Sequence, residues 1–100
     1  MIEEIKRICR ENSKNIIWTS HVARRMAERD ISKEEILDAI EQGEVIKRYP
    51  DDRPYPSVLL YGNGLHVVCG LGKGKVSIVT VYRPSLDMWE PDMRTRRGRK

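Results

Sequence analysis

The residues best suited to chemistry begin at His21, which is followed four and eight positions later by Arg25 and Arg29. Side chains at this spacing share one face of an α-helix, and here they are rotated away from the apolar Val22 and Met26. Histidine suits proton transfer because its unperturbed pKa is about 6.5, and the planar arginine fork matches the oxygens of a phosphate. The stripe also begins at a predicted helix N-terminus, where backbone N–H groups favour an anion. The pattern therefore favours chemistry or binding at a phosphate group.

The same stripe also has a purely structural interpretation. His21 could only assist the helix cap, and the two arginines could pair with acids such as Glu28, Asp30 and Glu35. Both interpretations stay open, so the histidine is a candidate acid or base and both arginines are candidate phosphate ligands.

A second group of candidates lies in the C-terminal half of the chain. His66 stands in an apolar segment, where it is either a satisfied, half-buried side chain or, on an open sheet face, a second acid or base. Tyr82 and Arg83 end another apolar segment. Tyr82 could donate a proton and Arg83 could hold a phosphate, although a tyrosine at this place also suits the rim of a core or an interface.

Aromatic and acidic residues add weaker signals. Tyr49, Tyr55 and Tyr61 could provide stacking surfaces for bases. The proline-rich loop over residues 50–56 contains Asp51 and Asp52, which favour the backbone hydrogen bonds of a turn over a Mg²⁺ site.

The positive charge of the chain is concentrated at its C-terminus. Lys and Arg number 19 against 15 Asp and Glu, which gives a net charge of +4. Residues 1–93 contain 14 of the bases and all 15 acids, so their net charge is −1. The remaining bases include Arg94, Arg96 and Arg97, which could hold RNA phosphates or could belong to a solvated tail. The near-neutral body favours a binding module over a nuclease that depends on a basic surface.

The length of 100 residues predicts one domain over residues 1–93, followed by a basic, flexible tail over residues 94–100. No apolar run is long enough to span a membrane and the N-terminus lacks the apolar core of a signal peptide, so we expect a cytoplasmic protein. Cys9 and Cys69 fall in apolar patterns that predict buried thiols. Because the chain has 2 histidines, we expect no metal site built from protein ligands and no cofactor.

Periodicity and cap signals predict about three helices before residue 44. Apolar residues at helical spacing predict a helix over residues 2–13, and Thr19 or Ser20 can cap a second helix over residues 21–29. Residues 16–18 form an apolar lead-in between these two helices. Ser32 and Glu35 form a capping-box pattern that opens a third helix, which Gly43 is expected to stop.

After residue 43 the pattern becomes typical of strands, which we expect over residues 44–49, 58–62, 65–70 and 75–82. Asn63-Gly64 is a strong hairpin signal, a second turn covers residues 71–74, and Met88 and Trp89 could dock back onto the body. We therefore expect an α+β fold in which the N-terminal helices pack on one face of a four-stranded antiparallel meander.

Several motifs occur in an order that matches a known family. Residues 21–32 have the pattern H-x-x-x-R-M-x-x-R-x-I-S, and the pattern continues in residues 43–46 (G-E-V-I), 49–54, 65–68 and 78–82. Over about residues 18–91 the chain resembles the small prokaryotic domain-of-unknown-function 4258 family. The layout of that family is similar to that of the RelE-type and BrnT-type toxin nucleases, which cut mRNA without a metal ion and are silenced by an antitoxin.

The resemblance implies a RelE-like architecture, an RNA substrate, an antitoxin partner and metal-independent cleavage through attack of a 2′-OH. The alternative is a non-catalytic module that binds RNA or protein. Under the nuclease hypothesis, the residue patterns give His21, His66 and Tyr82 as catalytic candidates. The same patterns give six arginines as candidate RNA ligands, namely Arg25, Arg29, Arg83, Arg94, Arg96 and Arg97.

Overall fold

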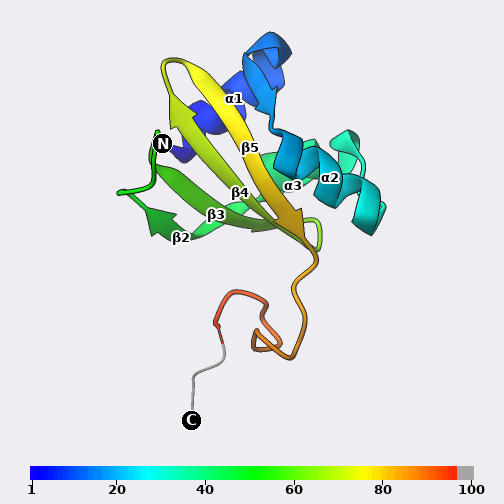
Figure 1. Cartoon of the computed structure of the whole chain (residues 1–100). Coiled ribbons are helices and arrows are strands. Elements are labelled where there is room, and N and C mark those ends of the chain that lie inside the picture. Colours follow the sequence, from blue (N-terminus) through cyan, green and yellow to red (C-terminus); the bar gives the residue numbers. More distant parts are fainter. Residues whose placement is uncertain (97–100) are drawn as a thin grey trace.

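Figure 1 shows the computed structural model of the chain, which describes residues 1–96. The N-terminal part consists of helix α1 (Ile2–Glu11), the 3-10 turn η1 (Ser13–Asn15) and the short strand β1 (Ile16–Trp18). Helices α2 (Ser20–Arg29) and α3 (Lys33–Gln42) follow. The remaining strands are β2 (Glu44–Tyr49), β3 (Ser57–Gly62), β4 (Leu65–Gly72) and β5 (Lys75–Tyr82). The expected α+β class is confirmed.

The strands form one five-stranded sheet in the order β1-β5-β4-β3-β2. β2 to β5 pair antiparallel as a meander, whereas β1 lies parallel to β5, with Ile17 opposite Ser77. The prediction of four antiparallel strands was therefore wrong, because residues 16–18 are a strand and not a lead-in. A run of 3 residues is too short to show alternation, and its partner lies at the far end of the sequence.

Side-chain caps fix where α2 and α3 begin. Thr19 is the N-cap of α2, and its Oγ1 accepts a hydrogen bond from the backbone N–H of Val22 at 3.1 Å. The predicted capping box is confirmed at the start of α3, where Ser32 Oγ accepts from the Glu35 N–H and Glu35 Oε1 accepts from the Ser32 N–H. α3 stops at Gly43 as expected, whereas α1 ends at Glu11, short of the predicted residue 13.

The hairpin turns confirm the glycine signals. Asn63 and Gly64 have φ values of 51° and 72°, and Lys73 and Gly74 have φ values of 54° and 73°. Two consecutive positive φ values match the twist of the flanking strands, so each tight turn sets the register of its hairpin. β2 and β5 have the predicted bounds, whereas β4 extends to Gly72, past the predicted residue 70.

The helices and one face of the sheet share a single core. Apolar residues of the helices, such as Ile36 and Ile40, pack with alternate residues of the strands, such as Leu60 and Val67. Cys69 is buried as predicted, and Cys9 is partly buried against the same core. Burial raises the pKa of Cys9 to about 11, so its thiol stays protonated at neutral pH. None of the helices described over residues 1–96 is long and apolar enough to cross a membrane.

Candidate functional site

The sheet face opposite the core, called the open face below, carries three rows of side chains. Residues paired across antiparallel strands point to the same side, and the residues between them point to the core. From β2 to β5 the rows are Glu44-Tyr61-His66-Tyr82, then Lys47-Leu59-Val68-Thr80, then Tyr49-Ser57-Gly70-Ser77.

Residues 84–96, called the C-terminal segment below, return to this face after β5. Trp89 packs edge-on against the imidazole of His66, with ring centroids 4.4 Å apart, and is only 7% exposed. The Asp92 carboxylate accepts hydrogen bonds from two backbone N–H groups of the turn that follows, and Trp89 forms a β-bridge with Arg96. The predicted docking of Trp89 is confirmed, whereas Met88 is 46% exposed.

His66 is fully buried beneath this segment, and its hydrogen bonds define its protonation. Nε2 lies 2.7 Å from the carbonyl oxygen of Met93, and Nδ1 lies 3.1 Å from the hydroxyl oxygen of Tyr82. Because a carbonyl can only accept, Nε2 carries the proton and Nδ1 accepts from the Tyr82 hydroxyl in the neutral form. Burial lowers the pKa of His66, and the hydrogen bond to Met93 opposes that shift.

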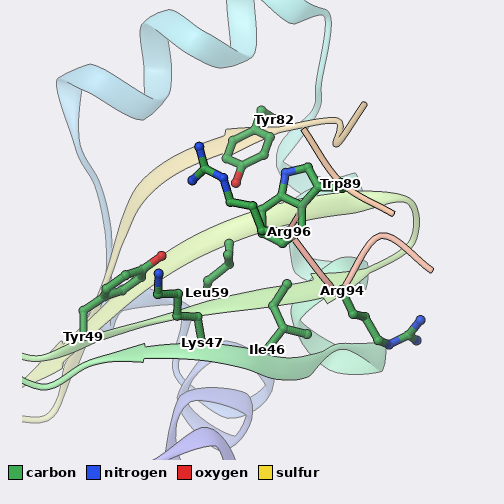
Figure 2. Close-up of a pocket in the computed structure, with 8 residues that line it drawn as sticks. All are labelled: Ile46, Lys47, Tyr49, Leu59, Tyr82, Trp89, Arg94 and Arg96. Carbon is green, nitrogen blue, oxygen red and sulfur yellow. The ribbon is translucent and has the colours of Figure 1, made fainter. Parts of the chain in front are cut away.

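A pocket of about 240 Å³ opens beside this hydrogen-bonded chain (Figure 2). Figure 2 shows the Tyr82 hydroxyl and the Arg96 side chain in the upper part of the pocket, with Lys47 and Tyr49 on the opposite side. Aromatic and basic side chains dominate the lining, which consists of Ile46, Lys47, Tyr49, Leu59, Tyr82, Trp89, Arg94 and Arg96.

The electrostatics of the pocket favour an anion beside neutral phenols. Burial raises the pKa of both Tyr49 and Tyr82, and the positive charge of Arg96 opposes that shift in each case. The Lys47 ammonium lies 5.6 Å from the centroid of the Tyr49 ring. The pocket can therefore hold a phosphate on cations and a planar group on aromatic rings.

Arg94 lines this pocket with its stem, and its guanidinium points away from it (Figure 2). The guanidinium forms an ion pair with Glu44 and lies 4.8 Å from the centroid of the Tyr61 ring. Arg94 therefore holds the C-terminal segment to the sheet, while the Arg96 side chain lies in the pocket. Arg97 lies outside the described residues.

Of the stripe predicted on α2, Arg29 reaches the outer edge of β5, near the N-cap residue Thr19 of the same helix. Arg29 donates to the carbonyl of Val81 at 2.7 Å, and Thr19 donates to the carbonyl of Ile78 at 2.9 Å. Arg25 pairs with Glu28 at 2.7 Å. These contacts give the two arginines of the stripe a structural role, because they satisfy edge carbonyls and an acid on the same helix.

Two further candidates also stand apart from the pocket. His21 is exposed on the first turn of α2. Arg83 donates to the carbonyl of Arg29 at 2.8 Å and lies 3.7 Å from the Glu35 carboxylate. The pocket lining described for residues 1–96 includes neither side chain, so the structure groups His66, Tyr82 and Arg96 and leaves the α2 stripe outside that group.

Sequence reasoning missed Lys47 and treated Tyr49 and Trp89 only as stacking or docking residues. The signal for Lys47 was available, because it stands in a predicted strand at an even spacing from the flagged Tyr49. A bulge between Val45 and Lys47 changes the alternation at this point, however, and only the structure reveals it. Within residues 1–96, no group of three or more His, Cys, Asp or Glu side chains could hold a metal ion.

Comparisons with known proteins identify the domain by its family. Residues 18–83, about two thirds of the chain, match the model described as Domain of unknown function (DUF4258). No curated protein and no solved structure matches the chain. The chain therefore belongs to the DUF4258 family, as its motifs predicted.

Proposed function

For this member of a family of unknown function, we propose that the open-face pocket binds single-stranded RNA and cleaves it without a metal ion. The observation that carries this proposal is the hydrogen-bonded chain from Tyr82 through His66 to the Met93 carbonyl, which begins at a cationic and aromatic pocket. That arrangement provides both a proton path and a phosphate-binding surface, which metal-free phosphoryl chemistry requires.

Binding would use the two kinds of side chain that line the pocket. Arg96 and Lys47 would hold a phosphate group, and the ring of Tyr49 would stack on a base. Stacking tolerates any base because every base has a π-face, so this pocket by itself predicts binding to single strands with little sequence preference.

In the proposed reaction the 2′-OH attacks the neighbouring phosphorus, and the bond from phosphorus to the 5′ oxygen breaks. Tyr82 takes the 2′-OH proton on its hydroxyl oxygen while its own proton moves to Nδ1 of His66. The Met93 carbonyl, which accepts from Nε2, stabilises the imidazolium that forms. The chain then runs in reverse and protonates the leaving 5′ oxygen, so the products are a 2′,3′-cyclic phosphate and a 5′-hydroxyl.

A non-catalytic RNA-binding module is the second candidate. The net charge of −1 over residues 1–93 favours it, because binding would then rest on a local patch instead of a broad basic surface. A module would use the same pocket without turnover. In both versions we expect a cytoplasmic location, and the nuclease version implies a RelE-like mode of action with an antitoxin partner.

The test is cleavage of a short, end-labelled, single-stranded RNA by the purified protein in EDTA, followed by gel electrophoresis. We expect products that end in a 2′,3′-cyclic phosphate and no cleavage at a position carrying a 2′-deoxy sugar. Because proton transfer by a side chain contributes roughly 100-fold or more, Tyr82→Phe should lower the rate by about that factor and leave RNA affinity unchanged.

Tyr61→Phe is the matched control, since Tyr61 also contacts the ring of His66 but does not line the pocket. Its rate should equal that of the wild type. Binding without cleavage by the wild-type protein would overturn the nuclease assignment in favour of the module, and absence of both binding and cleavage would overturn both.

A further inference from the structure

A second, smaller pocket of about 100 Å³ opens on the same face. Residues of the loop between β2 and β3 line one part of it, and residues of β3, β4 and β5 line the rest. The lining consists of Asp52, Arg53, Pro54, Tyr55, Ser57, Gly70, Ser77 and Val79. Sites for drug-sized molecules usually have a volume of roughly 300 Å³ or more. This pocket is smaller, so it has room for one small group and not for a whole nucleotide.

The two pockets meet at one row of the sheet. Tyr49, which lines the first pocket, pairs with Ser57, which lines the second. Gly70 and Ser77 continue that row across β4 and β5. Because consecutive rows are about 7 Å apart along a strand, neighbouring nucleotides of one RNA strand could occupy both pockets.

Two glycines of β4 give the second pocket its shape. At Gly72 an added Cβ would lie 2.2 Å from the ring of Tyr55, so this glycine lets the ring sit directly on the sheet as a wall. At Gly70 an added Cβ would meet only the Pro56 carbonyl at 3.6 Å and Ser77 at 4.0 Å, which are ordinary contacts. An alanine therefore fits at Gly70 without a clash, and its methyl group would occupy part of the space beside Ser77.

The polar groups of this pocket select for a donor. The Asp52 carboxylate accepts a hydrogen bond from the Ser57 hydroxyl at 2.5 Å through Oδ2. Among the residues that the structure describes, Ser57 is the side chain that donates to this carboxylate. Oδ1 of Asp52 can therefore accept a hydrogen bond from a ligand. The Ser77 hydroxyl, which also lines this pocket, can donate or accept.

We propose that the second pocket binds one guanine base of the RNA strand whose phosphate lies in the first pocket, and so sets a sequence preference. Guanine fits this lining because N1–H and the N2 amino group present adjacent donors to the Asp52 carboxylate, and its flat ring can stack on Tyr55. Uracil presents one such donor, and adenine and cytosine each present an amino group beside an acceptor that the carboxylate would repel. This inference rests on RNA binding at the first pocket.

The experiment compares the affinity of a hexamer of deoxyuridine with the affinities of hexamers in which one position is deoxyguanosine, measured by fluorescence anisotropy. All sugars are 2′-deoxy with uracil or guanine bases, so that no cleavage occurs. We expect one deoxyguanosine position to raise the affinity of the wild-type protein about tenfold, the size of a good base contact. Asp52→Asn should remove that gain, because the amide can turn a donor toward the base, and should leave the affinity for the deoxyuridine hexamer unchanged.

Two further variants test whether the second pocket causes the preference for guanine. Gly70→Ala occupies part of the pocket without a backbone clash and should also abolish the gain. Asp51→Asn changes the same charge at the neighbouring position, which does not line the pocket, and should keep the gain. Equal affinity for all hexamers, or a preference that survives Asp52→Asn, would overturn the guanine assignment and leave the proposed function standing. Failure to bind any hexamer, together with failure to bind the ribose forms, would overturn both.

Discussion

The imidazole of His66 is buried among the rings of Tyr61, Tyr82 and Trp89, and its two nitrogens have different partners. Nε2 faces a carbonyl that only accepts, and Nδ1 faces a hydroxyl that can donate. Because the two partners differ, the neutral imidazole keeps its proton on Nε2. Nδ1 is then free to accept the hydrogen bond from the Tyr82 hydroxyl. Because His66 is fully buried and is not among the residues that line the pocket, its part in the proposed reaction would run through Tyr82.

The same burial makes the stability of the fold depend on pH. Since burial lowers the pKa of His66, the unfolded chain binds a proton more readily than the folded one near the ordinary value of 6.5. The free energy of unfolding should therefore fall as pH drops from about 7 through 6.5 and level off below the folded-state pKa. Urea denaturation at a series of pH values would measure this slope.

His66→Asn is the variant that isolates the effect, because it removes the titrating imidazole and keeps a polar group that can accept from the Tyr82 hydroxyl in place of Nδ1. It should lower the free energy of unfolding at pH 7 and flatten its dependence on pH between 7 and 5. A pH dependence as steep as that of the wild type would show that another group causes it.

At the scale of elements, α2 protects an edge of the sheet. β1 covers the outer edge of β5 only up to Ile78, and beyond that point Thr19 and Arg29 of the α2 region bind its carbonyls. An exposed edge strand invites pairing with other chains, so this cover replaces a missing strand. Of the predicted stripe, Arg29 contributes to the cover and Arg25 pairs with Glu28 on its own helix, so both arginines have partners within the fold.

Thr19 joins the two parts of this cover, since its hydroxyl accepts from the Val22 N–H and donates to the Ile78 carbonyl. Thr19→Val keeps the shape of the side chain and should lower the free energy of unfolding by about 1–2 kcal/mol, because both hydrogen bonds are lost. Thr19→Ser keeps the hydroxyl and should cost clearly less. Urea denaturation of the three proteins measures both effects, and equal losses for the two variants would contradict this role.

Sequence patterns located some of these elements accurately and missed others for physical reasons. The bounds of β2 and β5, the capping box at Ser32 and the turn at Asn63 all depend on local signals, which a single sequence contains. β1 was missed because only its pairing with distant β5 makes it a strand. The pocket was missed because it exists only after Trp89 returns to the open face, which is a contact between distant parts of the chain.

Across the whole molecule, the positive charge is local: it gathers at the pocket of the open face and not over the general surface. Residues 1–93 carry a net charge of −1, yet Lys47 and Arg96 both line one pocket of the open face. The C-terminal segment therefore brings positive charge from the end of the chain to the sheet. A protein with this distribution can bind RNA at one place without a strong field over its remaining surface.

The salt dependence of RNA affinity tests this distribution. Each cation that neutralises a phosphate of a single strand contributes about 0.7 to the slope of log affinity against log salt concentration. Arg96→Gln and Lys47→Gln should each reduce that slope by about this amount, and the double variant by about twice as much. Lys14→Gln removes the same charge from the η1 turn, outside the lining of the pocket, and should leave the slope unchanged. If all three single variants lowered the slope equally, binding would follow the overall charge of the molecule, and the pocket would have no special part in it.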